Sequence, residues 1–481
     1  DPDRVREPMK RQANGTFAAI SWTNAIKEIS DAIKAASAEA KQSVFFTKSL
    51  TGSTADLLAS FLNKQSNSAH VSYQLHSNVL LDQSIEVAFG SGVEAKYNFA
   101  NADTIVGIGA DYLETWNSPI EHSRGWGERR RPEVETGKPQ NYVFHIEPRL
   151  SLTAANADQW IKNAPGSEEA ILLAILAHLD QNGKIVQNQD IVRGILQGRS
   201  TSELIEGTGL ELSTLTKVAN RLAKNRNGLV VAGGSAVSGE RGAKVLLLTH
   251  VLNTALGFQG NTFTLIAKKD SPTNAKSLSF SNFVTALQDD KVGVAVFVNS
   301  NPTFTLPAKN EFKAALAKAN FVVSITTSLD ETAVLSNIVL PLSTNFESWS
   351  DGENRNGVYT INQPAMAPLY SSQSFGDTLL ALSRELGIEL SQAITFYEYI
   401  QERFKIRFGS LNFKSQWLVA LDKGGVFANT TSTVDRSLRP GLRIETFTAE
   451  KPAKDSLSLL AFSTIRALDG SEVNRPWLQE L

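Results

Sequence analysis

The sequence predicts an α/β protein with doubly wound, mostly parallel sheets. Short runs of β-branched and aromatic residues, apolar on both faces, recur as far as residue 342, as expected for strands buried in a parallel sheet. Segments with helical periodicity separate these runs, which is the alternation typical of doubly wound architecture. After about residue 346 this alternation stops, and helical segments lead into a Thr/Ser-rich, strand-like tail.

Each predicted element follows from its local pattern. The apolar runs predict strands at 43–47, 70–74, 104–109 and 141–146, and a second series at 228–234, 262–267, 292–299, 321–326 and 337–342. Helical spacing of apolar residues predicts helices at 20–40, 308–319, 376–387, 392–405 and 413–422.

The length and one polar turn indicate the domain organisation. The 481 residues leave room for roughly three domains. A polar turn at 224–228 separates the two series of strands, so we expect two Rossmann-like blocks. The predicted boundaries are a helical lead-in at 1–42, a first block at 43–225, a second block at 226–345, and a helical then β-rich segment at 346–481.

Composition excludes several classes of function. The 47 basic and 49 acidic residues nearly cancel, so no basic field is available for nucleic acid. Cysteine is absent, which excludes disulfides, thiolate zinc sites, iron–sulfur ligation and cysteine nucleophiles within these residues. The six histidines form no metal-ligand pattern, so we predict no metal site. The longest apolar run, 170–177, is too short for a bilayer span, and any leader peptide before Asp1 would lie outside the sequence.

Three motifs mark the starts of helices. Ser328 and Glu331 have the spacing of a capping box, in which the serine accepts from the backbone and the glutamate reaches back. Ser167 can cap a helix whose first turn carries Glu168 and Glu169. The loop 233–239 follows a strand and opens a helix, but its glycine spacing is not G-x-G-x-x-G. A phosphate-binding loop and a plain strand–helix turn both stay open for it.

The order of several segments resembles the molybdopterin oxidoreductase (DMSO reductase) superfamily. The segments are "RVREPMKRQANGTFAAISWTNAIKEI", "NADTIVGIGADYLETW", "HIEPRLSLTAANADQWIKNAPGSEEAILLAI" and "SLDETAVLSNIVLPLSTNFESWSDGENRNG". Two further stretches, "YNFANADTIVGIGADYLETWNSPIE" and the final "NRPWLQEL", resemble one branch more closely. That branch is the molybdopterin-like half of the large iron–sulfur subunit of alternative complex III.

This resemblance implies a function without chemistry of its own. The expected role is a non-catalytic, cofactor-free scaffold in a membrane-bound respiratory complex that oxidises quinol and passes electrons to a cytochrome or other periplasmic acceptor. The implied partners are an iron–sulfur region of the same subunit, which would follow the tail and hold iron–sulfur clusters, a multihaem cytochrome subunit, and integral membrane quinol-binding subunits. The implied location is the outer, periplasmic face of the cytoplasmic membrane.

Two other functions remain as alternatives. One is an active catalytic subunit that carries molybdopterin guanine dinucleotide and acts on a small inorganic compound. The other is a noncatalytic molybdopterin-like domain of a complex I-type assembly, against which the PWLQEL ending argues.

The resemblance also places candidate pocket residues. Gly109 and Asp111 follow one strand, and Glu147, Pro148 and Arg149 follow another, at strand ends where open α/β sheets bind ligands. The acids could hold ribose or guanine edges and Arg149 a phosphate, or all could be ordinary strand-end polar residues. Active family members ligate molybdenum through Cys, selenocysteine, Ser or Asp, and here Ser77 is the hydroxyl nearest that place. We therefore interpret Ser77, Gly109, Asp111, Glu147 and Arg149 as a vestigial pocket, and expect no catalytic residue.

Overall fold

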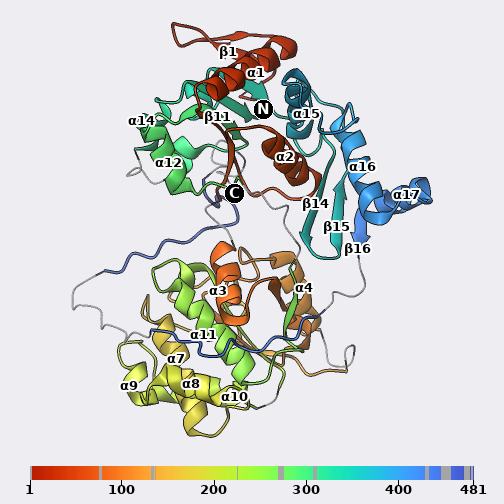
Figure 1. Cartoon of the computed structure of the whole chain (residues 1–481). Helices are drawn as coiled ribbons and strands as arrows, with labels where there is room; N and C mark the ends of the chain where they lie inside the picture. Colours follow the sequence, from red (N-terminus) through yellow and green to blue (C-terminus); the bar gives the residue numbers. More distant parts are fainter. Residues whose placement is uncertain are drawn as a thin grey trace. The chain divides into compact units, whose positions relative to one another are not determined.

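The chain forms two compact units in the computed structural model (Figure 1). Unit 1 comprises 1–75, 269–430 and 469–474, and unit 2 comprises 76–268, 431–468 and 475–481. The structure describes residues 3–74, 78–131, 135, 137–224, 226–268, 276–306, 311–427, 433–445, 457–470, 477 and 480.

Both units are discontinuous in sequence, unlike the blocks predicted at 43–225 and 226–345. The reason is strand pairing. Strand β9 (Gly228–Ala232) pairs in parallel with β6 (Thr104–Ile108), and β11 (Val292–Val298) pairs in parallel with β3 (Gln42–Thr47). Each pair joins segments from both sides of the polar turn at 224–228.

Unit 1 is built on a seven-stranded sheet in the order β2-β1-β13-β12-β11-β3-β4. The pairs from β13 to β4 are parallel, whereas β1 and β2 form an antiparallel edge. The remaining strands of this sheet are β1 (Met9–Arg11), β2 (Phe17–Ala19), β4 (Ser68–Ser72), β12 (Phe321–Thr326) and β13 (Ile338–Pro341). A separate three-stranded antiparallel sheet consists of β14 (Ser350–Arg355), β15 (Val358–Asn362) and β16 (Gly425–Phe427).

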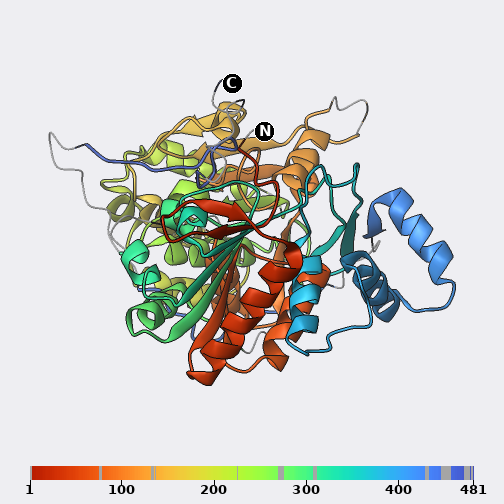
Figure 2. The same ribbon diagram turned by 90° about the horizontal axis from the view of Figure 1, so that it is seen from above.

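Helices cover both faces of the seven-stranded sheet because side chains alternate along its strands. Phe45 packs with α1 (Trp22–Ala38), α2 (Gly52–Lys64) and α15 (Phe375–Glu385), and its neighbour Phe46 packs on the other face with α12 (Phe280–Gln288) and α14 (Phe312–Leu316). Figure 2 shows these two layers of helices on either side of the strands. The other helices of the unit are α13 (Pro302–Thr305), η4 (Ala333–Leu335), α16 (Phe396–Phe408) and α17 (Phe413–Lys423).

Unit 2 is built on a four-stranded parallel sheet in the order β8-β7-β6-β9, with β7 at Tyr142–Ile146 and β8 at Gln159–Ile161. An antiparallel pair, β5 (Val93–Tyr97) and β10 (Phe263–Ala267), lies apart from it. The helices are α3 (Val79–Phe89), η1 (Phe99–Asn101), α4 (Pro119–Glu128), α6 (Leu152–Ala155), α7 (Glu168–Gln181), α8 (Gln189–Leu196), α9 (Thr201–Ile205), α10 (Leu212–Leu222), η2 (Gly234–Val237) and α11 (Gly242–Ala255). Helix α7 is buried almost all round, which explains its apolar run.

The predicted fold class is confirmed: the chain is a mixed α/β protein with parallel sheets. Each predicted strand overlaps an observed one, and the helices predicted at 20–40, 376–387, 392–405 and 413–422 correspond to α1, α15, α16 and α17. The helix predicted at 308–319 is shorter in the described residues, where α14 begins at Phe312. The strands of the C-terminal region flank its helices, as β14, β15 and β16.

The predicted capping box at Ser328 is wrong. No helix of the described residues begins there, and Glu331 instead accepts a hydrogen bond from Asn301 Nδ2 at 2.6 Å. Asp330 stabilises a local turn, because its Oδ1 accepts from the backbone amides of Thr332 and Ala333 at 3.1 and 2.8 Å. Burial raises the pKa of Asp330 to about 6.

The helix start predicted at Ser167 is confirmed in position, with Glu168 and Glu169 in the first turn of α7. The Ser167 hydroxyl, however, donates to the Ala164 carbonyl at 2.6 Å and makes no cap bond. Among the described helices, none combines the length and hydrophobicity that crossing a bilayer requires.

Candidate functional site

The predicted pocket residues of unit 2 gather at one edge of its parallel sheet. Strands β7, β6 and β9 run in parallel, so the loops that follow them meet at their carboxyl ends. Asp111 follows β6, Glu147 and Arg149 follow β7, and Ser235 follows β9. The structure therefore brings together four of the five residues interpreted as a pocket, Gly109 among them, and the fifth, Ser77, lies outside the described residues.

Arg149 lies between the two carboxylates and bonds to both. Its Nε donates to Glu147 Oε1 at 3.0 Å, and its Nη2 donates to Asp111 Oδ2 at 3.1 Å. The Arg149 side chain is 19% exposed, whereas those of Asp111 and Glu147 are 2% and 0% exposed. The guanidinium is thus turned inward toward buried acids, and it is held by them.

The second oxygen of Asp111 is also occupied. Oδ1 accepts from the Thr153 hydroxyl at 2.5 Å and from the Thr153 backbone amide at 3.1 Å. Thr153 lies in α6, and its hydroxyl oxygen in turn accepts from the Leu113 amide at 3.1 Å. Both oxygens of Asp111 therefore serve to hold the loop after β6 to the loop after β7.

Glu147 is satisfied in the same way. Its Oε1 also accepts from the Ser235 hydroxyl at 3.2 Å, and its Oε2 lies 3.2 Å from His145 Nε2. Burial acts to raise the pKa of Glu147, but the hydrogen bonds from His145 and Ser151 and the charge of Arg149 outweigh it and lower that pKa. Glu147 is therefore a carboxylate at neutral pH, and its charge is balanced within the protein.

The backbones of two loops come into close contact at this edge. Gly109 has a φ of +59°, and a Cβ there would lie 2.8 Å from the Ala236 Cβ and 3.0 Å from the Gly233 carbonyl oxygen. At Gly234, with φ +53°, a Cβ would lie 2.4 Å from the Gly109 carbonyl oxygen. These glycines allow the loops after β6 and β9 to touch each other, so the loop 233–239 is a tight strand–helix connection.

The corresponding edge of unit 1 is closed by an acid of the protein itself. Helix α2 follows β3, and the start of such a helix attracts anions. There, Asp351 accepts from the Ser53 amide at 2.7 Å, from the Ser53 hydroxyl at 2.6 Å and from the Tyr359 hydroxyl at 2.7 Å. Burial raises the pKa of Asp351, against the effect of these bonds. A side chain of β14 thus fills the place that a phosphate would take.

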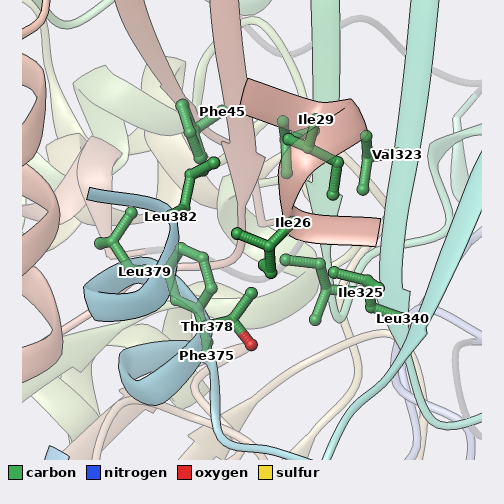
Figure 3. Close-up of a pocket in the computed structure, with 11 residues that line it drawn as sticks. Ile26, Ile29, Phe45, Val323, Ile325, Leu340, Phe375, Thr378, Leu379 and Leu382 are labelled. Atoms are coloured by element: carbon green, nitrogen blue, oxygen red, sulfur yellow. The ribbon is translucent and has the colours of Figure 1, made fainter. Parts of the chain in front are cut away.

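Two cavities of the described residues are lined by other side chains. The first, of about 10 Å³, is lined by apolar side chains of α1, α15 and the sheet of unit 1, including Ile29, Val323 and Leu379 (Figure 3). Its one hydroxyl, from Thr378, donates to the Ser374 carbonyl, so nothing there would bind a polar ligand. The second, of about 190 Å³, lies beside β8 in unit 2 and opens to solvent. Neither is lined by a predicted pocket residue.

Comparison with known proteins decides the family. The sequence profile described as Molybdopterin oxidoreductase matches residues 4–383, most of the chain. The chain belongs to the molybdopterin oxidoreductase family. The resemblance of the quoted segments to this superfamily is confirmed.

Relatives of this molybdopterin oxidoreductase chain include respiratory proteins. It is 28% identical over 410 residues to the menaquinone reductase molybdopterin-binding-like subunit of Nitratidesulfovibrio vulgaris, covering 82% of this chain and 58% of that protein. It is 24% identical over 467 residues to the arsenate respiratory reductase molybdopterin-containing subunit of a Shewanella species, covering 78% of this chain and 53% of that protein. The chain spans a little over half the length of these relatives.

A solved structure agrees with the fold. Acetylene hydratase from Pelobacter acetylenicus superposes with a TM-score of 0.65 at 14% identity, covering 80% of this chain and 62% of that one. At this identity the likeness shows the shared architecture alone.

The residues present do not fit the group that gives the family its name. A pterin dinucleotide needs free hydrogen-bonding groups at the strand ends, and here the oxygens of Asp111 and Glu147 are engaged by Arg149, Thr153 and their neighbours. Of the residue types that ligate molybdenum in the family, cysteine is absent from the chain, and the candidate Ser77 lies outside the described residues. The described residues hold no group of three or more His, Cys, Asp or Glu side chains suited to a metal ion.

Three residues at this edge were not predicted from the sequence. His145 stands two residues before Glu147, and strand alternation places both on one face, which was an available signal. Thr153 and Ser235 carry no such signal, because their roles depend on which loops meet. Phe462 was also missed: its ring lies 4.2 Å from the Arg149 guanidinium, and the amide of Ile465 donates to Glu114 at 3.2 Å.

Proposed function

We propose that this chain is a non-catalytic, cofactor-free scaffold domain of a membrane-bound respiratory complex that oxidises quinol, of the alternative complex III type. The observation that carries the proposal is the Arg149 network, in which the strand-end acids of unit 2 bond to the protein's own groups. A site that binds a substrate or a dinucleotide needs groups free to change partners, and these groups are committed to holding loops together.

Two further observations support the scaffold role. Asp351 occupies the helix start at the corresponding edge of unit 1. The similarity to the protein named as the menaquinone reductase molybdopterin-binding-like subunit extends over 82% of this chain. This similarity supports a place in a quinone-linked complex. The proposed partners are an iron–sulfur region of the same subunit, a multihaem cytochrome subunit and integral membrane quinol-binding subunits, at the periplasmic face.

The proposal is tested by purifying the complex through a tag on this chain, under mild detergent. We expect co-purification of haem and iron–sulfur centres with an integral membrane subunit, and oxidation of a short-chain quinol. A variant with a neutral strand-end cluster, Asp111→Asn, Glu147→Gln and Arg149→Met combined, should assemble and oxidise quinol at the wild-type rate.

The alternative, a molybdopterin guanine dinucleotide enzyme acting on a small inorganic compound, gives the opposite results. The chain would then purify with reductase activity toward such a compound, and the neutral variant would lose that activity while it still assembles.

A further inference from the structure

The hairpin of α16 and α17 in unit 1 has an inner face of packed aromatic side chains. The Phe404 ring centroid lies 5.1 Å from that of Trp417 and 6.1 Å from that of Phe413. The Lys405 Nζ lies 4.4 Å from the centroid of the Phe413 ring and joins the end of one helix to the start of the next. The hairpin therefore has a fixed conformation of its own, stabilised by aromatic packing and by the contact at its turn.

The outer face of the same hairpin exposes large apolar side chains. Ile406 is 70% exposed, Leu411 is 84% exposed and Leu418 is 57% exposed. Leu411 lies in the turn between the helices, and Ile406 lies in the last turn of α16. Figure 2 shows this hairpin at the margin of unit 1, beside β14 and β15. Apolar groups on a tight turn, with no side-chain cover in the described residues, are typical of a surface that meets an apolar phase.

The exposed charges beside Ile406 and Leu411 are positive, whereas the exposed Asp422 lies at the far end of α17. Lys405 and Lys414 are exposed next to Ile406 and Leu411, and Lys423 is exposed at the end of α17. The two arginines of α16 are already paired, Arg403 with Asp56 and Arg407 with Glu353. Exposed lysines around an apolar tip attract an anionic surface, while their long stems let the charge stay in the aqueous layer.

The composition favours a lipid surface over a protein partner. Protein interfaces are depleted in lysine and enriched in tyrosine, tryptophan and arginine. The exposed tip has the reverse composition, with Leu, Ile and Lys outside and the aromatic rings inside. Aliphatic side chains beside lysines also occur in segments that lie in the membrane interface.

We propose that the α16–α17 hairpin is a membrane-contact element, which inserts Ile406 and Leu411 into the interface of an anionic bilayer. Lys414 bonds to the lipid headgroup phosphates at the tip, while Lys405 keeps its contact with the Phe413 ring. Leu418 lies one helical turn beyond Lys414 and extends the same face. The inference stands on this surface alone and does not depend on the absence of a cofactor or on the proposed quinol complex.

The experiment is flotation of the purified chain with vesicles of phosphatidylcholine, alone or mixed with phosphatidylglycerol. The wild type is expected to float with the anionic vesicles, and high salt should reduce the bound fraction because it screens the lysines. Ile406→Glu combined with Leu411→Glu should lower the apparent affinity roughly tenfold or more, since two apolar side chains lose their burial. Lys414→Gln should weaken binding to the anionic vesicles alone.

The matched control adds the same two charges elsewhere. Val186 and Leu212 of unit 2 are 52% and 48% exposed, and Val186→Glu with Leu212→Glu should leave flotation unchanged. Circular dichroism checks that each variant is folded. The proposal is overturned if the wild type does not float with anionic vesicles, or if both double variants lose binding equally. It is also overturned if the hairpin variant floats normally but loses a co-purifying protein, which would make the hairpin a protein docking site.

Discussion

The Nη2 atom of Arg149 lies 3.1 Å from the Oδ2 atom of Asp111, although the two residues are 38 positions apart. This contact, with the bond from Arg149 Nε to Glu147, closes the strand-end edge of unit 2 with an internal ion cluster. In a buried cluster of this kind each member depends on the others, because removal of one leaves a charge without a partner. The predictions below follow from that dependence and from similar contacts in unit 1.

The first prediction concerns Arg149 itself. Arg149→Met should lower the free energy of unfolding by about 3 kcal/mol, because two buried carboxylates lose their partner. Urea denaturation measures the change. The matched control is the triple variant Asp111→Asn, Glu147→Gln and Arg149→Met, which removes all three charges and should recover at least half of the loss. Equal losses in the single and triple variants would show that Arg149 stabilises by packing and not by charge.

A second prediction concerns the buried pair of unit 1. Arg4 holds Glu347 with two hydrogen bonds, and Glu347 also accepts from the backbone amides of Thr344 and Leu369, each at 2.9 Å. Glu347→Gln should therefore cost about 3 kcal/mol at neutral pH. Glu28→Gln, which removes the partly exposed pair with Lys10, should cost less than about 1 kcal/mol.

The same variant has a defined pH dependence. The hydrogen bonds from Arg4, with those from the backbone, overcome burial and lower the pKa of Glu347 from 4.5 to about 2. A carboxyl with a lowered pKa contributes its full stability above the pKa of the unfolded chain and loses that contribution as the pH falls through the folded value. The difference between wild type and Glu347→Gln should thus be constant above pH 4.5 and shrink toward pH 2. A difference that grows on acidification would contradict this assignment.

A third prediction concerns the packing of His145. A Cβ at Gly107 would lie 2.4 Å from His145 Nδ1, and both residues are in the central strands of the unit 2 sheet. Gly107→Ala should lower the melting temperature, with a loss of about 1–3 kcal/mol from overpacking. Gly194 in helix α8 has open space around it, so Gly194→Ala should stabilise by roughly 0.5–1 kcal/mol through helix propensity. The decisive observation is that Gly107→Ala lowers the free energy of unfolding whereas Gly194→Ala raises it.

A fourth prediction concerns the start of α2. Asp351→Ala should remove the acid that the Ser53 amide and hydroxyl bind, and so leave an anion site open at the helix start. Sulfate should then raise the melting temperature of the variant by more than it raises that of the wild type. The wild-type increase reports the general effect of this salt. Equal increases would mean that Asp351 does not occupy an anion site.

The fold could be predicted from the sequence to a large extent, because burial on both faces gives strands such as 292–298 an unmistakable apolar pattern. The boundaries of the units were harder. Pairing of β9 with β6 and of β11 with β3 is a long-range choice, and no local pattern in the strands encodes their neighbours. The capping box predicted at Ser328 was wrong for a related reason: Asn301, from another loop, binds Glu331, and Asp330 stabilises a turn in place of a helix start.

The candidate site, like the fold, could be predicted from the sequence only in part. The positions of Asp111, Glu147 and Arg149 at strand ends could be predicted, because loops that follow parallel strands share one edge. That the three bind one another could not, since it depends on side-chain reach and on the approach of Thr153 and Ser235 from other loops. From the sequence alone, an occupied ligand pocket remained an alternative to the favoured interpretation of these residues as a vestigial, empty pocket.

Metal and pterin analysis of the chain, purified from the organism that produces it, tests the central claim most directly. Elemental mass spectrometry measures molybdenum and tungsten, and fluorescence after oxidative release measures pterin. The closed Arg149 cluster predicts no molybdenum, tungsten or pterin above background, with iron–sulfur and haem iron present in the partners. About one molybdenum or tungsten per chain, with pterin in proportion, would contradict the account.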